Sequence, residues 1–478
     1  MIEWESRGPG NGPSALRVAA LDIPVAYDAD VVVVGAGPGG FAAALQAARM
    51  GARVMVVEKF DMPGGVHTSG LQGAAGIGIG GIHSELMERF ERDGCLYTAN
   101  ADTHPDWAGN PLSHYEQLKQ PGDAFARMTF NPEGAGCVMA GLLHEAGAEV
   151  LYDTRFVDCA VQAGPGDGRI RAIVVENASG RFAISGRIFI DGSGTAEVVA
   201  RAGAPFVRGG GGQPEGAEWD GIARPIPGGL LWTMTGVDFE GLVRHQRHAQ
   251  DPLLEKAMAE ARAAGDLPDG IYRPRMGGKG VYGAMYIGHP TLDMSPISTD
   301  GTYVLWQNVP YELGLHMDDD GADNAKAIRL LRGHIDAEAR FLRKYVGGFE
   351  TASIASVGRF VGVRDGRHPI GEHVFCLDDV RAGRRFRDAV TRPMTKKFFW
   401  DGYRDYEHEV SFKSFLPRKI DNLILTGASL SFSYECIFMV MRNFPWCTLT
   451  GEIAGYAAAR CIEQKIGPKD LEWSEPYL

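Results

Sequence analysis

The first regular pattern of apolar and polar positions along the chain begins near residue 30. An apolar, β-branched run at residues 30–34 leads into a glycine loop at 35–40. A helical pattern over 41–50 follows, and a second apolar run at 53–57 ends on Glu58. Runs of this length and spacing predict strand, tight turn, helix and strand, which together form a βαβ unit.

The hydrophobic pattern also predicts helices and strands along the rest of the chain. Helices are predicted over 82–92, 130–147, 322–345 and from about 449 to 464, and strands over 149–152, 156–161, 170–176, 182–184, 187–191 and 423–427. Because the strand–helix pattern stops after residue 205 and returns near residue 416, we expect a discontinuous, doubly wound α/β domain of the Rossmann-like kind with an inserted α+β substrate domain.

The predicted domain organisation has five parts. They are an N-terminal tail (1–26), the first part of the cofactor domain (27–205), a substrate or cap domain (206–355), an interdomain and active-site segment (356–415), and the last part of the cofactor domain (416–478).

Composition narrows the functional classes. The net charge of −12 argues against nucleic acid as a main partner. The seven cysteines are scattered and contain no C-x-x-C, so we predict neither a disulfide framework nor a metal site. The first 27 residues contain no apolar signal-like region, and no apolar run is long enough to span a bilayer. We therefore expect a cytoplasmic protein without a membrane partner.

The glycine loop carries the most specific chemical signal. Gly35, Gly37 and Gly40 fit G-x-G-x-x-G, with Pro38 and Gly39 between them. In such a loop the first glycine makes the turn, the second lets backbone approach a pyrophosphate, and the third lets helix and strand pack closely. The helix N-terminus then directs N–H groups and its positive dipole end at the phosphates. Glu58, followed by Lys59, stands where a carboxylate accepts hydrogen bonds from ribose. This unit is predicted to bind an adenine dinucleotide.

Two further glycine-rich segments belong with this unit. Residues 64–81 are so rich in glycine that we interpret them as backbone laid over a ligand, the alternative being a flexible surface loop. A second strand runs into Asp191, Gly192, Ser193 and Gly194, which would bring Asp191 and nearby backbone to the same dinucleotide from a neighbouring strand.

These landmarks together resemble the FAD-dependent oxidoreductases related to the succinate dehydrogenase and fumarate reductase flavoproteins. The markers, in chain order, are the fingerprint with Glu58, Gly64-Gly65, residues 130–133, residues 189–194, residues 202–204, residues 362–367 with Gly371-Glu372, and Arg442 followed by residues 450–452 and 454–455. The resemblance covers most of the chain outside residues 206–350.

The resemblance implies bound FAD, reversible or covalent, with its ring at the junction of two domains. Glu58 would bind the AMP ribose, Gly64 and Gly65 would line the pyrophosphate and flavin, and backbone at Phe156 and Val157 would meet adenine. Gly427 belongs to the returning strand–turn, and the last helix, near Leu449 and Thr450, would face the flavin pyrimidine. A helix N-terminus there stabilises the negative charge of reduced flavin.

Val66, His67 and Thr68 resemble the segment that carries the flavin-linked histidine in succinate dehydrogenases. Two interpretations remain open. His67 either bonds covalently to FAD or packs and hydrogen-bonds beside it.

Candidates for chemistry gather in two places. Arg364, Arg367 and His368 form the first cluster. An arginine fork suits a carboxylate or enolate-like oxygen, and a histidine can act as a base near neutral pH. The alternative for the arginines is an ion-paired interdomain hinge, and for His368 a structural role. Glu435 and Arg442 form the second group, and they too have a structural alternative, pairing with each other.

We therefore expect an enzyme in which FAD takes a hydride from a small organic substrate, of the specialised-metabolite class, to form a C=C, C=N or C=O bond. Oxygen or another acceptor would reoxidise the flavin. A flavin monooxygenase and a non-catalytic FAD-binding redox protein are the alternatives.

Overall fold

The computed structural model describes residues 2–4, 16–18, 22–73, 80–99, 127–163, 167–209, 225, 228–248, 254–268, 295–296, 301–309, 313–392, 394–398, 404–433, 436 and 442–477. Everything below refers to these residues. None of their helices is both long enough and apolar enough to cross a membrane.

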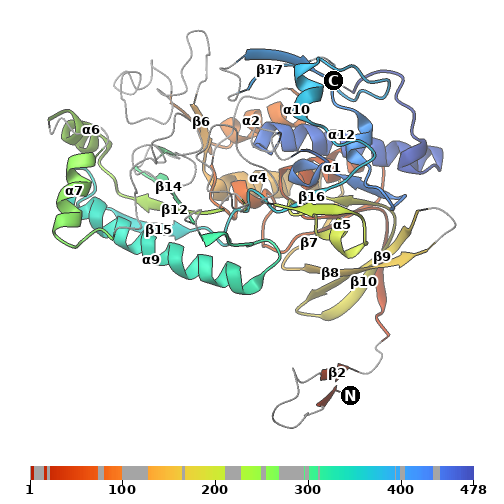
Figure 1. Cartoon of the computed structure of the whole chain (residues 1–478), viewed down its shortest axis with the longest axis horizontal. Coiled ribbons are helices and arrows are strands. Elements are labelled where there is room, and N and C mark those ends of the chain that lie inside the picture. The colour runs from red at the N-terminus through yellow and green to blue at the C-terminus, as the bar shows by residue number, and fades with distance from the viewer. Residues whose placement is uncertain are drawn as a thin grey trace.

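A seven-stranded sheet forms the centre of the larger part of the molecule (Figure 1). Its path runs β7-β4-β3-β10-β9-β8, and β19 pairs with the C-terminal part of β10. The bounds are β3 Val25–Val34, β4 Val54–Val57, β7 Glu149–Leu151, β8 Arg155–Gln162, β9 Arg169–Asn177, β10 Gly180–Asp191 and β19 Leu423–Leu425. Strands β7, β4, β3, β10 and β19 are parallel, whereas β8 and β9 are antiparallel. The second half of β3, Val31 to Val34, is almost wholly buried because both faces of the sheet are covered there.

Helices α1 (Pro38–Arg49) and α12 (Phe444–Gln464) lie side by side against this sheet, next to α2 (Gly81–Arg92) and α4 (Pro132–Glu145). Glycines let α1 and α12 approach closely. A Cβ at Gly451 would lie 2.1 Å from the Gly39 oxygen, and one at Gly455 would lie 2.2 Å from the Ala43 oxygen. This contact fixes the start of α12 beside the start of α1.

A second hydrophobic core belongs to a separate antiparallel sheet, ordered β13-β14-β12-β15. These strands are β12 Gly229–Thr235, β13 Ser295–Pro296, β14 Tyr303–Asn308 and β15 Ser353–Val357, and the accompanying helices are α6 Phe239–His248, α7 Glu255–Ala263 and α9 Gly321–Tyr345. We call this unit the cap. It lies to one side of the central sheet (Figure 1).

The remaining elements are short. Two-stranded sheets pair β1 Ile2–Trp4 with β2 Leu16–Val18, β5 Leu96–Ala99 with β6 Arg127–Phe130, β11 Phe206–Arg208 with β16 Arg367–Pro369, and β17 Met394–Phe398 with β18 Arg404–His408; the short helices are α5 Glu197–Arg201 and α10 Leu377–Arg381.

The predicted α/β fold class is confirmed, with a mixed Rossmann-like sheet and separate small antiparallel sheets. Two details differ from the sequence prediction. Residues 182–191 form one strand instead of two, because backbone pairing with β3 continues through Ser185 and Gly186. Helix α12 begins at Phe444, five residues before the predicted start, where Asn443 caps it and Pro445 occupies its first turn.

Candidate functional site

The turn between β3 and α1 has the geometry that the glycine pattern predicts. Gly35 has φ +88°, a conformation that favours glycine. A Cβ at Gly40 would lie 1.8 Å from the Gly35 oxygen, so the third glycine serves close packing behind the turn. At Gly37 a Cβ would meet only the Gly192 oxygen, at 3.8 Å, and would otherwise stand in open space. Within the described part of the chain, no side chain caps the N-terminus of α1.

Glu58 lies at the end of β4 beside this turn. Its carboxylate is only 3% exposed, and it accepts hydrogen bonds from the backbone N–H groups of Ala36 (2.6 Å) and Phe60 (3.0 Å). Burial raises the pKa of Glu58, and the two N–H donors act in the opposite direction. Both oxygens keep acceptor capacity toward the adjoining space.

The loop after β4 folds over the glycine turn. Gly64 donates its N–H to the Ala36 oxygen (2.7 Å), and Gly65 lies against Gly37. His67 is buried, its Nδ1 lies 3.0 Å from the Gln72 oxygen, and its ring packs on Phe444 with centroids 4.6 Å apart. The Thr68 hydroxyl donates to the Pro63 oxygen, which keeps this side chain inside the loop.

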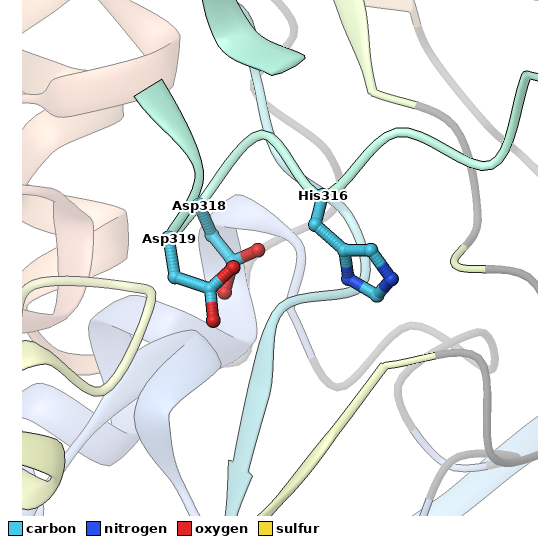
Figure 2. Close-up of side chains that lie close together, drawn as sticks. All are labelled: His316, Asp318 and Asp319. Atoms are coloured by element: carbon cyan, nitrogen blue, oxygen red, sulfur yellow. The ribbon is translucent and has the colours of Figure 1, made fainter. Parts of the chain in front are cut away.

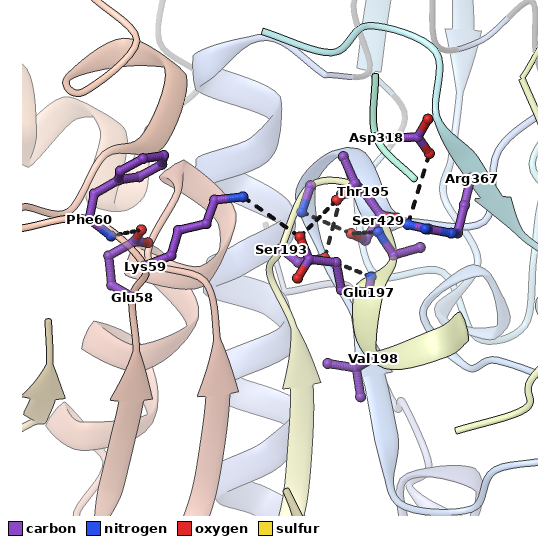
Figure 3. Close-up of polar contacts among 12 residues, drawn as sticks. Glu58, Lys59, Phe60, Ser193, Thr195, Glu197, Val198, Asp318, Arg367 and Ser429 are labelled. Carbon is purple, nitrogen blue, oxygen red and sulfur yellow. Dashed lines mark hydrogen bonds and ion pairs between the residues drawn. The ribbon is translucent and has the colours of Figure 1, made fainter. Parts of the chain in front are cut away.

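The end of β10 approaches the same turn from the other side. Asp191 is fully buried and caps α5, because Oδ2 accepts from the N–H groups of Val198 (3.0 Å) and Val199 (3.1 Å). Burial raises its pKa. Farther along, Glu197 lies 3.6 Å from Lys59, so an ion pair joins the ends of β4 and β10 across β3 (Figure 3).

A cleft of about 320 Å³ runs along these loops and continues beneath the cap. Sixteen of the residues predicted from sequence line it: Gly35, Gly37, Pro38, Gly39, Glu58, Lys59, Gly65, Val66, His67, Phe156, Gly192, Ser193, Gly194, Arg364, Gly427 and Arg442.

The other candidate residues lie elsewhere. Gly40, Gly64, Thr68, Val157, Asp191, Arg367, His368, Leu449 and Thr450 are not among the lining residues, and Glu435 falls outside the described part of the chain. Since α12 begins earlier than predicted, Cys447 occupies the cleft wall in place of Leu449 and Thr450. Thr450 instead accepts the Gly427 N–H at 3.1 Å and so positions the adjacent loop.

Two of the predicted catalytic residues make structural contacts. His368 is buried, and its Nε2 lies 2.6 Å from Asp365 Oδ1. Arg367 donates to the Thr195 oxygen at 3.0 Å and lies 3.9 Å from both Asp318 and Asp319 (Figure 3). It therefore joins the loop after β10 to the turn that precedes α9, which matches the hinge alternative better than substrate binding.

Sequence reasoning missed most of the cap side of the cleft. That wall is formed by Gly229, Leu231, Met317, Asp318, Asn324 and residues 360–363. Residues 362 and 363 belong to the marker at 362–367, whereas no local motif marks Gly229, Leu231, Met317, Asp318 or Asn324. Phe360 stacks on Phe60 with centroids 4.7 Å apart, and Lys59 lies over both rings, so the cap side also contacts the nucleotide loops.

One group of side chains in the described residues has the spacing of a metal site. His316, Asp318 and Asp319 place their ligand atoms within 4.8 Å of one another (Figure 2). Two guanidinium groups already face these carboxylates, Arg208 at 2.6 Å from Asp319 and Arg367 at 3.9 Å. The local charges are thus compensated without a cation.

The nucleotide half of the cleft fits FAD. Gly37 leaves open space at an uncapped helix N-terminus, where a diphosphate would meet backbone N–H groups. Glu58 stands one strand away, where it would accept from ribose hydroxyls. His67, Arg442 and Cys447 also line the cleft. Burial raises the pKa of Cys447 to about 12, so its thiol is neutral at neutral pH.

Known proteins agree with this assignment. The sequence profile of the FAD dependent oxidoreductase family matches residues 30–475. A dihydrolipoyl dehydrogenase from Manduca sexta is 46% identical over 50 residues, and the matched stretch spans only 10% of each chain. Among solved structures, a geranylgeranyl bacteriochlorophyll reductase-like protein from Thermoplasma acidophilum is 15% identical, with 92% of this chain and 80% of that chain covered and a TM-score of 0.47. An anhydrotetracycline hydroxylase from Streptomyces rimosus is 13% identical, with 91% and 63% covered and a TM-score of 0.42. The profile match extends over nearly the whole chain, and the protein therefore belongs to the FAD dependent oxidoreductase family.

Proposed function

We propose that this FAD-dependent oxidoreductase takes a hydride from a small organic anion held between the cap and the flavin end of the cleft. The observation that carries this proposal is the composition of that wall. The cleft lining includes the positively charged Arg364 and Arg442, the carboxylate of Asp318, and the apolar side chains of Leu231 and Val361. Arg364 is 6% exposed, so its charge acts where water screens it little.

Each group has a distinct part in this scheme. Bound FAD would supply the hydride acceptor, with oxygen or another acceptor removing the electrons afterwards. The two guanidinium groups would orient a carboxylate or enolate oxygen by paired N–H donors. The apolar residues would exclude water from the reacting carbon. The product would contain a C=C, C=N or C=O bond.

Anaerobic bleaching of the flavin tests this function. We expect at least one compound from a panel of carboxylates, amino acids and phenols to bleach the purified holoprotein. The variants R364Q and R442Q should lower the rate by about 100-fold or more, since each removes a charged, bidentate contact of about 3 kcal/mol. R359Q is the matched control, because Arg359 lies on the same segment but pairs with Asp61 outside the cleft. If no compound bleaches the flavin, or if R359Q is equally slow, the proposal is wrong.

A flavin hydroxylase is the second candidate. The apolar wall and the two arginines would also hold a phenolate ring. The hydroxylase and reductase named above share only the fold, so they do not decide between the two functions. Consumption of NADPH and oxygen together with a product that has gained one oxygen atom would establish hydroxylation.

Covalent attachment of FAD through His67 and closer kinship with the succinate dehydrogenase flavoproteins remain parts of the proposal. The position of His67 in the cleft wall supports the first, and the sequence markers support the second. Acid precipitation decides the attachment. A yellow pellet that becomes colourless in H67A supports it, whereas colour leaving with the supernatant refutes it.

A further inference from the structure

The proposed oxidation needs a group that takes up the substrate's second hydrogen as a proton. Among the described residues, three carboxyl side chains line the cleft: Glu58, Glu197 and Asp318. Glu58 accepts from two backbone N–H groups in the nucleotide half, and Glu197 pairs with Lys59 there. Asp318 alone of the three belongs to the turn below the cap, next to Met317 and near Asn324 in the same wall.

The environment of Asp318 favours the protonated form of its carboxyl group. Its side chain is 4% exposed, and that of the neighbouring Asp319 is 8% exposed. The two carboxylates stand beside each other, with the His316 ring on the same stretch of chain (Figure 2). Asp319 is ion-paired through Oδ2 with Arg208 on β11, at 2.6 Å, whereas the guanidinium nearest to Asp318, that of Arg367 on β16, is 3.9 Å away. The charge of Asp319 therefore acts on Asp318.

We propose that Asp318 is the acid–base residue that exchanges a proton with the substrate in this cleft. This inference rests on the proposed function. In the proposed oxidation one C–H bond of the substrate would break, and both of its electrons would pass with the hydrogen, as hydride, to bound FAD. The remaining proton leaves an adjacent O–H, N–H or C–H group, whose electron pair forms the new double bond, and is taken up by a carboxylate oxygen of Asp318. In the reverse direction the same carboxyl group returns the proton.

The ionisation of Asp318 is suited to this exchange. Burial, and then the charge of Asp319, raise its pKa, while Arg367 and His316 act in the opposite direction. A carboxylate with a raised pKa is a stronger base, and its pKa lies closer to the working pH.

The kinetic test compares pH profiles of anaerobic flavin bleaching by the panel compound that bleaches the wild type fastest. We expect D318N to bind FAD normally, to bleach about 100- to 10,000-fold more slowly, and to lose the acidic limb of the profile. D319N should keep the maximal rate but move the acidic limb to lower pH, because removing the neighbouring charge lowers the pKa of Asp318. D336N is the control, since Asp336 is an exposed acid of α9 that pairs with Arg340.

Three results would overturn the inference. One is an acidic limb that persists in D318N and disappears in H67Q. Another is a wild-type rate in D318N. The third is wild-type bleaching that EDTA abolishes and added Zn²⁺ or Mg²⁺ restores, because a cation would then occupy His316, Asp318 and Asp319.

A second measurement does not need a substrate. In the infrared spectrum of the holoprotein, a carboxylic-acid band that titrates in the wild type, shifts to lower pH in D319N and is missing from D318N supports the assignment. Absence of such a band overturns it. If no compound bleaches the wild type, the proposed function fails, and the infrared titration still decides whether Asp318 carries the proton.

Discussion

The substitution G37A separates binding of the dinucleotide from folding of the protein. Gly37 has φ −59° and ψ 176°, a conformation that alanine adopts without strain. The added methyl group would meet only the Gly192 oxygen, at 3.8 Å, which is ordinary contact. We therefore expect the free energy of unfolding of the apoprotein to change by less than about 0.5 kcal/mol.

Binding of FAD should respond very differently. The methyl group would stand in the cleft, at the uncapped start of α1, and would push a diphosphate away from the backbone N–H groups. A hydrogen bond to a charged group contributes about 1.5–3 kcal/mol. Loss of one such bond weakens binding about 10- to 150-fold.

The assay is titration of apoprotein with FAD, followed by flavin fluorescence, together with thermal unfolding of the apoprotein. G141A is the control, because its new Cβ on α4 would have no neighbour within 4 Å and lies outside the cleft. G40A provides a steric contrast, since its Cβ would lie 1.8 Å from the Gly35 oxygen and should destabilise the fold itself. Wild-type FAD affinity in G37A would refute the placement of the diphosphate at this turn.

Three further predictions concern the supports of the site. T450V removes the acceptor of the buried Gly427 N–H and should lower the free energy of unfolding, measured by chemical denaturation, by about 1–3 kcal/mol. T448V is the comparison, because the Thr448 hydroxyl donates to the Phe444 oxygen of the same helix. Equal losses in the two variants would contradict the role assigned to Thr450. F360A removes the stack on Phe60 and should increase the rate of FAD release about 2- to 10-fold, measured as recovery of free flavin fluorescence. An unchanged rate would show that this contact does not help to retain FAD. Glu338 is buried in the cap core, and burial raises its pKa well above the usual value. The folded protein therefore holds this proton more tightly than the unfolded chain. The free energy of unfolding of the wild type should fall relative to that of E338Q as pH rises from about 4.3 toward the folded-state pKa. The unfolding temperatures of the wild type and E338Q, measured across this pH range in excess FAD, check the prediction. If the two plots of unfolding temperature against pH run parallel, Glu338 does not titrate this way.

The nucleotide half of the site could be predicted because its signals are local. The glycines of the first turn, the apolar run of β3 and the carboxylate of Glu58 all lie within one short stretch, and each has a backbone reason for its position. Asp191 was the exception. Its place between a strand and a second glycine turn predicts contact with the dinucleotide, and in the structure its carboxylate accepts from the N–H groups of Val198 and Val199 at the start of α5.

The other half could not be predicted in this way. Asp318 stands in a run of three aspartates with no motif around it, and only the packing of the turn before α9 brings it to the cleft. His368 has a suitable residue type, but it is buried in β16, where its Nε2 pairs with Asp365 three residues earlier. The start of α12 could have been placed better from Asn443 and Pro445, which are a capping residue and a first-turn proline.

Substitutions in the FAD half and in the substrate half of the cleft should have different effects on the enzyme. The FAD half depends on backbone geometry that few residues other than glycine can supply, so substitutions there should act on cofactor affinity. The substrate half is assembled from side chains of β12, the turn before α9, the segment after β15 and the loop before α12. These segments contact the nucleotide loops through the stack of Phe60 on Phe360 and the bond from Arg367 to Thr195. Arg359 adds a backbone hydrogen bond from its N–H to the Ser69 oxygen and an ion pair with Asp61. Substitutions at Leu231, Asp318, Arg364 or Arg442 should therefore alter which substrate reacts, and how fast, while leaving the yellow colour of the purified protein unchanged.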